Sequence, residues 1–181
     1  MRELIRTCLE QGLNTERLFL RKLRLEDAKD MFEYTSSAKT CQYLTWGPHK
    51  EQGEAQAFIC KALKKYEAAQ EILWGIEEKQ DQRLIGVVRI YEIERQTAKV
   101  SYVLNEWYTG KGYMTEAIGA VIQCCFDCLE MHTVFADYVE GNHPSKRVME
   151  RCGMVPVERP PTPVIIKDKA TRLFQCKIQK G

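Results

Sequence analysis

The sequence lacks any long apolar run and any excess of one charge. No window of its 181 residues approaches the roughly 18 apolar residues of a membrane span. The opening residues Met1–Arg6 also lack the apolar stretch of a signal peptide. Lysine and arginine number 27 against 25 aspartates and glutamates, a balance that argues against nucleic acid or an anionic membrane as the main partner. We therefore expect a cytoplasmic protein.

Repeats, linkers and low-complexity tracts are also absent, while 44% of the residues are hydrophobic. That content is enough to build one sizeable core in a chain of this length. We expect a single domain over residues 1–181, present as a monomer or homodimer.

Cysteine is plentiful, with eight residues, but its spacing is irregular. Scattered cysteines at apolar positions indicate reduced, mostly buried thiols rather than a disulfide framework. Cys125, Cys128 and His132 form a fragment of a metal-binding pattern, but no second pair follows at zinc-site spacing. Because the same residues fit core positions of one helix and its exit, we expect no metal site.

Hydrophobic periodicity predicts a mixed α+β fold. Strands are expected over residues 17–23, 72–76, 84–93, 98–104, 133–139 and 172–178. Helices are expected over residues 26–34, 54–69, 114–129 and 142–152, with an irregular loop between 36 and 53 and a proline-rich loop from 156 to 163. Short polar links between the second, third and fourth strands predict an antiparallel meander.

The turn Gly110-Lys111-Gly112 joins a predicted strand to a predicted helix. Glycines let a backbone approach a ligand closely, and the first N–H groups of a helix bind phosphate well. The spacing excludes a P-loop, which needs a glycine at position 105, where Asn105 stands. It also excludes a dinucleotide fingerprint, which needs a glycine in place of Thr115. An ordinary strand-to-helix connection remains the alternative.

Four segments together resemble the GNAT acetyltransferase superfamily and, within it, the ribosomal-protein alanine N-acetyltransferases. They are residues 15–21, 44–49, 110–117 and 142–154, and their order and separation match that family. The resemblance implies the GNAT fold. That fold has a mostly antiparallel central sheet of six to seven strands, splayed at strands 4 and 5 and flanked by about four helices.

The resemblance also implies acetyl-CoA as cosubstrate. The backbone at Val103 and Leu104 would bind the pantetheine arm, and Asn142 and Ser145 would line its far side. The pyrophosphate would be held by the turn, formed by Gly110, Lys111, Gly112, Tyr113 and Met114. Thr109 and Met114 depart from the family's usual residues, which predicts altered cofactor contacts rather than lost binding, because the donors are backbone amides.

Direct transfer requires a neutral amine. About 14% of a peptide N-terminus with a pKa near 7.8 is neutral at pH 7, against about 0.04% of a lysine near 10.4. An N-terminal acceptor therefore needs only a modest base. The candidates are Glu92, Glu94, Glu106 and Glu140, of which we select Glu92, although each also fits a solvated surface acid.

Two further groups are assigned to the reaction. Ser145 is expected to hydrogen-bond the leaving thiolate, unless it only caps its helix. The Leu104 N–H is expected to stabilise the developing oxyanion. Trp46 and His49 are expected to contact the acceptor. Lys146 and Arg147 fit either a phosphate contact or a solvated basic helix face.

The leading hypothesis is an amine acceptor such as a protein N-terminus, but other acceptors and another class of function remain open. The alternatives are a small amine, antibiotic or amino acid, or a CoA-binding module without chemistry.

Overall fold

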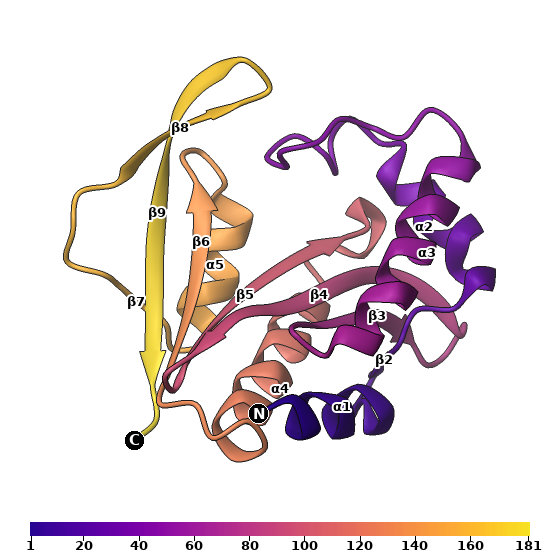
Figure 1. Cartoon of the computed structure of the whole chain (residues 1–181). Helices are drawn as coiled ribbons and strands as arrows, with labels where there is room; N and C mark the ends of the chain where they lie inside the picture. Colours follow the sequence, from indigo (N-terminus) through magenta and orange to yellow (C-terminus); the bar gives the residue numbers. More distant parts are fainter.

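A mostly antiparallel sheet of nine strands organises the chain in the computed structural model, which describes residues 1–181 (Figure 1). The strands are β1 (Leu13–Asn14), β2 (Leu18–Arg21), β3 (Ile72–Glu78), β4 (Arg83–Glu94), β5 (Thr97–Leu104), β6 (Thr133–Val139), β7 (Val155–Pro156), β8 (Thr162–Ile166) and β9 (Lys169–Gln179). Their order is β1-β2-β3-β4-β5-β6-β9-β7, with β8 paired to β9. The predicted α+β class and the antiparallel meander, here β3-β4-β5, are confirmed.

Five α-helices and two short 3₁₀ turns cover the sheet. They are α1 (Arg2–Gln11), η1 (Leu25–Asp27), α2 (Ala28–Thr35), α3 (Gln52–Ala68), η2 (Glu106–Tyr108), α4 (Tyr113–Asp127) and α5 (His143–Arg151). Helix α1 was not predicted, although its buried residues Ile5, Cys8 and Leu9 follow helical spacing. None of the helices is both long enough and apolar enough to cross a membrane.

The two faces of the sheet bury separate cores. Strand β3 shows how, because Ile72, Trp74 and Ile76 join the larger core with α1, α4 and α5. The intervening Leu73 joins the smaller core with α2 and α3. Alternate residues of a strand point to opposite faces, so α1, α4 and α5 lie on one side of the sheet and α2 and α3 on the other.

Helix α4 crosses the larger core. The predicted stripe of Met114, Ile118, Val121, Ile122, Cys125 and Leu129 is buried throughout, with no member more than 5% exposed. Burying such a stripe fixes the direction of the helix. The amino end of α4 follows directly from η2 and the glycine turn.

The carboxyl-terminal region differs from the prediction of a proline-rich loop followed by one strand. Residues 162–166 form β8, which pairs with the early part of β9 to make a hairpin. Pro163 lies within β8, and β8 pairs with β9 alone. A proline is tolerated on such an edge strand because its missing N–H has no ladder partner to satisfy.

Candidate functional site

A gap opens in the sheet between β5 and β6, as Figure 1 shows. The two strands pair in parallel only from Thr97–Thr133 to Val100–Ala136. Beyond that point β5 continues beside β4 to Leu104, while β6 continues beside β9 to Val139. The predicted splay is therefore present, and it leaves one edge of each strand without a strand partner.

The backbone at the end of β5 faces this gap. The Asn105 N–H donates to the Ile85 carbonyl on β4 at 2.8 Å. Because successive backbone groups of a strand alternate between its two edges, the N–H of Leu104 points away from β4 and into the gap. This is the donor that we expected to stabilise an oxyanion.

A cavity of 390 Å³ occupies the mouth of the gap. Eight residues predicted to bind the cofactor line it: Val103, Leu104, Gly110, Gly112, Tyr113, Met114, Asn142 and Ser145. Lys111 instead lines a neighbouring hollow. The structure thus brings residues from β5, the glycine turn and α5 to one place.

The glycine turn presents backbone donors to the cavity. Gly110 and Gly112 have φ values of +77° and +82°, which other residues adopt only with strain. The first hydrogen bond of α4 runs from the Glu116 N–H to the Gly112 carbonyl at 3.0 Å. No side chain caps the helix, so its leading amides have no partner within it and can bind an anion.

A polar network ties this turn to the amino-terminal part of the chain. The Glu116 carboxylate accepts hydrogen bonds from Thr15 Oγ1 at 2.6 Å and from Arg17 Nε at 2.7 Å. Arg17 Nη1 also donates to the Lys111 carbonyl at 2.9 Å, and the guanidinium lies 4.4 Å from the centre of the Tyr113 ring. Two of the sequence segments that resemble the family are therefore in direct contact.

This network keeps Glu116 ionised. Burial opposes its charge, but the hydrogen bonds from Thr15 and from the backbone and side chain of Arg17 outweigh burial and lower the pKa of Glu116. The ion pair thus anchors the glycine turn to the amino-terminal part of the chain.

Ser145 lies at the first turn of α5. Its N–H donates to the side chain of Asn142, the N-cap residue, at 3.2 Å. Its hydroxyl lies 3.0 Å from the Tyr102 hydroxyl, which also donates to the Ser145 carbonyl at 3.1 Å. The side chain of Asn142 therefore caps the helix, while the Ser145 hydroxyl is positioned by Tyr102.

Tyr102 was missed by sequence reasoning. Burial is the main cause that raises its pKa, so the phenol stays protonated and can donate a hydrogen bond at neutral pH. The strand alternation contained a signal, because Tyr102 shares a face of β5 with Leu104.

The structure does not support Glu92 as a base. Its carboxylate is 58% exposed and pairs with Lys99 at 3.0 Å. Gly86 pairs with Leu104 at the cavity, so Glu92 lies roughly 15 to 20 Å farther along β4, at the other end of the sheet. Because β4 is antiparallel to β5, its beginning and not its end lies beside Leu104.

Glu106 is the acid that lines the cavity. It accepts a hydrogen bond from the Ser37 hydroxyl and pairs with Lys39 at 3.0 Å, and its side chain is 18% exposed. The bond from Ser37, followed by that from Lys39, lowers the pKa of Glu106. Of the remaining candidates, Glu94 is exposed at the distant end of β4, and Glu140 pairs with Arg172.

Trp46 and His49 do not line the cavity. Their rings stack on each other at 5.2 Å, and the His49 N–H donates to the Thr35 carbonyl at 2.9 Å. The preceding part of the same loop forms the wall instead, namely Lys39, Thr40, Gln42, Tyr43 and Leu44. The Tyr43 hydroxyl donates to the Gly141 carbonyl at 3.0 Å, which closes this wall against the segment before α5.

Two arginines of α5 complete the cavity. Arg147 and Arg151 line it, and their i, i+4 spacing places them on one side of the helix. Lys146 instead pairs with Glu150 at 3.5 Å. Arg147 was considered from sequence and Arg151 was missed, although its spacing from Arg147 was a usable signal.

Comparisons with known proteins agree with this geometry. Residues 17–155 match the family described as Acetyltransferase (GNAT) domain. The chain is 32% identical over 154 residues to the Bacillus subtilis protein named probable N-acetyltransferase YjcK, covering 78% of this chain and 82% of that one. It is 23% identical over 150 residues to ribosomal protein uS5-alanine N-acetyltransferase of Escherichia coli, covering 78% and 76%.

A solved structure extends the likeness to the fold. A GNAT-family acetyltransferase from Bacillus anthracis superimposes with a TM-score of 0.82 at 25% identity, covering 93% of this chain and 98% of that one. The splayed sheet, the uncapped α4 and the family match lead to one conclusion. The chain belongs to the GNAT family and is an acetyl-CoA-dependent N-acetyltransferase.

Proposed function

We propose that the chain acetylates the N-terminal amine of a protein or peptide, through direct attack of that amine on the thioester of acetyl-CoA. The observation that carries this proposal is the pairing of Glu106, the acid that lines the cavity, with Ser37 and Lys39. This pairing stabilises the carboxylate and lowers its pKa, so Glu106 is a weak base. A weak base suits an acceptor that is already partly neutral at pH 7, such as an α-amine, better than it suits a lysine or a polyamine, which are almost fully protonated.

Charges around the cavity favour the same acceptor class. Lys39, Arg147 and Arg151 contribute cationic groups to its lining. Lys39 balances Glu106, and the cofactor pyrophosphate would balance the two arginines, so the lining has no excess of negative charge that would attract a polycationic acceptor. The related enzyme that acts on alanine of ribosomal protein uS5 supports a protein N-terminus as the acceptor.

The residues present fit acetyl-CoA, which supplies the acetyl thioester. The uncapped amides from Lys111 to Met114 would hold the pyrophosphate, with Arg147 and Arg151 as additional cations. The unpaired backbone edge at Leu104 would bind the pantetheine arm beside Val103. Met114 does not obstruct this arrangement, because its side chain packs in the core at 5% exposure.

Within the cavity, Glu106 would accept the proton of the attacking amine, directly or through water. The Leu104 N–H would donate to the oxygen on which charge develops. Ser145 would donate a hydrogen bond to the departing sulfur while its Oγ accepts one from the Tyr102 hydroxyl, whose single proton then no longer goes to the Ser145 carbonyl. Tyr102 is thus a positioning residue.

A peptide panel tests the proposed acceptor. Peptides with varied first residues and free α-amines are compared with Nα-blocked peptides that contain lysine and with spermidine, by release of the CoA thiol. We expect turnover of one class of free N-termini, with the acetyl group located there by mass spectrometry. Turnover of small amines alone would overturn the acceptor. Tight CoA binding without turnover of any amine would overturn the proposed chemistry.

A further inference from the structure

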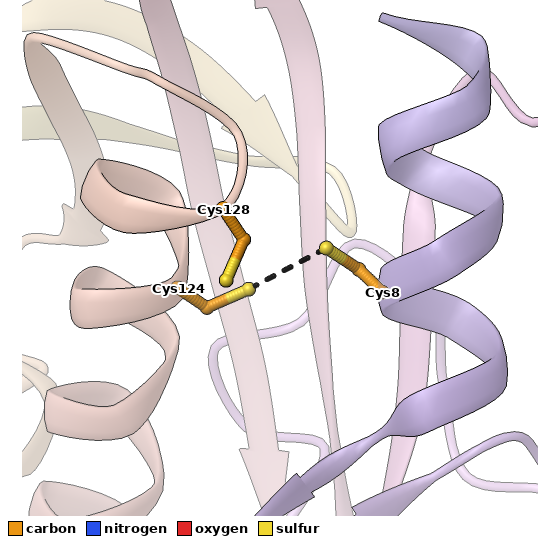
Figure 2. A group of neighbouring side chains, drawn as sticks. All are labelled: Cys8, Cys124 and Cys128. Atoms are coloured by element: carbon orange, nitrogen blue, oxygen red, sulfur yellow. Dashed lines mark hydrogen bonds between the residues drawn. The ribbon is translucent and has the colours of Figure 1, made fainter.

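Three cysteines from opposite ends of the sequence meet away from the cavity. Cys8 lies on α1, and Cys124 and Cys128 lie at the end of α4. Their sulfur atoms all lie within 4.8 Å of one another, and the Cys124 thiol donates to Cys8 Sγ at 3.8 Å. Figure 2 shows the three side chains converging between the two helices.

This group differs from the pattern considered in the sequence. Cys125 is fully buried in the core, and neither it nor His132 belongs to the cluster. Cys124 and Cys128 are four residues apart and so lie on one side of α4. Cys8, 116 positions from Cys124, supplies the third thiol, which no local motif could reveal.

The spacing of the sulfur atoms suits a metal ion. Tetrahedral Zn–S bonds of about 2.3 Å place two sulfur ligands about 3.8 Å apart. The Cys8–Cys124 distance already equals this separation, and the limit of 4.8 Å leaves about 1 Å of adjustment for the third. A disulfide requires sulfur atoms about 2.05 Å apart, a larger displacement.

Access also suits a metal. Cys128 is exposed, which gives an ion a path from solvent.

We propose that Cys8, Cys124 and Cys128 form a binding site for one thiophilic divalent metal ion, such as Zn²⁺. Binding releases three thiol protons to solvent, and a water molecule or external thiol completes the tetrahedron. Ten residues of helix lie between Tyr113 and Cys124, which corresponds to a rise of about 16 Å. The ion therefore does not contact the acetyl-transfer cavity, and it clamps α1 to α4.

Cobalt titration of the reduced full-length chain tests this site. Co²⁺ reports thiolate ligation through charge-transfer absorption, and Zn²⁺ then displaces it. We expect one Co²⁺ per chain in the wild type and in Cys60→Ser, whose cysteine is exposed on α3. Cys8→Ser and Cys128→Ser should each weaken Zn²⁺ binding by about 100-fold or more. Each variant removes a metal ligand, which lowers the affinity more than removing a residue that only hydrogen-bonds to a ligand.

Two results would overturn the proposal. One is the absence of a thiolate–cobalt band in the reduced wild type. The other is retention of the wild-type band in Cys8→Ser. Cys128→Ser keeps the test valid if Cys8→Ser misfolds, because Cys128 is exposed and circular dichroism will show whether the fold persists.

Peptide mapping of the unreduced chain adds a further outcome. A disulfide from Cys8 to either partner, with no cobalt binding after reduction, would make the cluster a redox pair instead.

Discussion

At its amino end, helix α4 presents uncapped amides between a glycine turn and a polar cavity, whereas at its carboxyl end two of its cysteines lie against Cys8 of α1. The first end owes its chemistry to the backbone, because unpaired N–H groups attract anions whatever the side chains are. The second owes its chemistry to side chains, because sulfur atoms select soft cations.

The two ends also differ in what holds them. The ion pair of Arg17 with Glu116 fixes the amino end through directional hydrogen bonds. The carboxyl end is fixed by packing, since Cys8 and Cys124 are 6% and 3% exposed. One helix can therefore position one site through polar contacts and another through burial. A variant at either end of α4 should mainly affect the site at that end.

The largest effect is expected inside the cavity. Glu106→Gln should lower kcat by about 100-fold, because it removes the proposed proton acceptor while keeping the shape of the side chain. Glu92→Gln is the matched control and should remain near wild type, because its carboxylate is exposed at the distant end of β4. Steady-state assays with an N-terminal peptide measure both. A similar loss in the two variants, or none in either, would remove Glu106 from the reaction.

Loss of the polar anchor should come next. Arg17→Ala removes the contacts to Glu116 and to the Lys111 carbonyl, so the turn loses its support. We expect the KM for acetyl-CoA to rise about 10-fold, equivalent to about 1.4 kcal/mol, with a smaller change in kcat. Lys22→Ala breaks the exposed pair with Glu10 and should change KM less than about 2-fold. Equal effects would show that Arg17 acts through general stability.

The sequence was sufficient to predict those parts of the fold and site that depend on local pattern. The buried stripe of α4 repeats over several turns, and the glycine turn stands directly before it, so both were found. Helix α1 carries apolar residues at helical spacing, a pattern that was present but overlooked, whereas Pro163 weakens the strand pattern of β8. Both gain stability from packing against partners elsewhere in the chain.

Side-chain convergence was harder to predict. Glu106 stands four residues before Gly110, so its sequence position already pointed to the cavity, whereas the antiparallel register of β4 places Glu92 away from it. Tyr102 approaches Ser145 only because β5 and α5 lie beside the same gap. The thiol cluster required α1, which was not predicted, to pack against α4.

A smaller effect is expected from Tyr102→Phe. It removes the phenol that contacts the Ser145 hydroxyl and carbonyl, and one hydrogen bond of about 1 kcal/mol corresponds to about 5-fold in kcat. Ser145→Ala should lower kcat at least as much. If Tyr102 only positions Ser145, the double variant should match Ser145→Ala. Additive losses in the double-mutant cycle would assign Tyr102 a separate contact.

The smallest expected effect concerns communication between the ends of α4. Acetyl-CoA affinity, measured by calorimetry on the reduced chain with and without one equivalent of Zn²⁺, should change by less than about 2-fold. The two sites lie about 16 Å apart along the helix and share no ligand residue, and distant sites couple by no more than about 0.5 kcal/mol. A 10-fold change would mean that α4 transmits the state of its thiols to its amides, and the two ends would then form one regulated site.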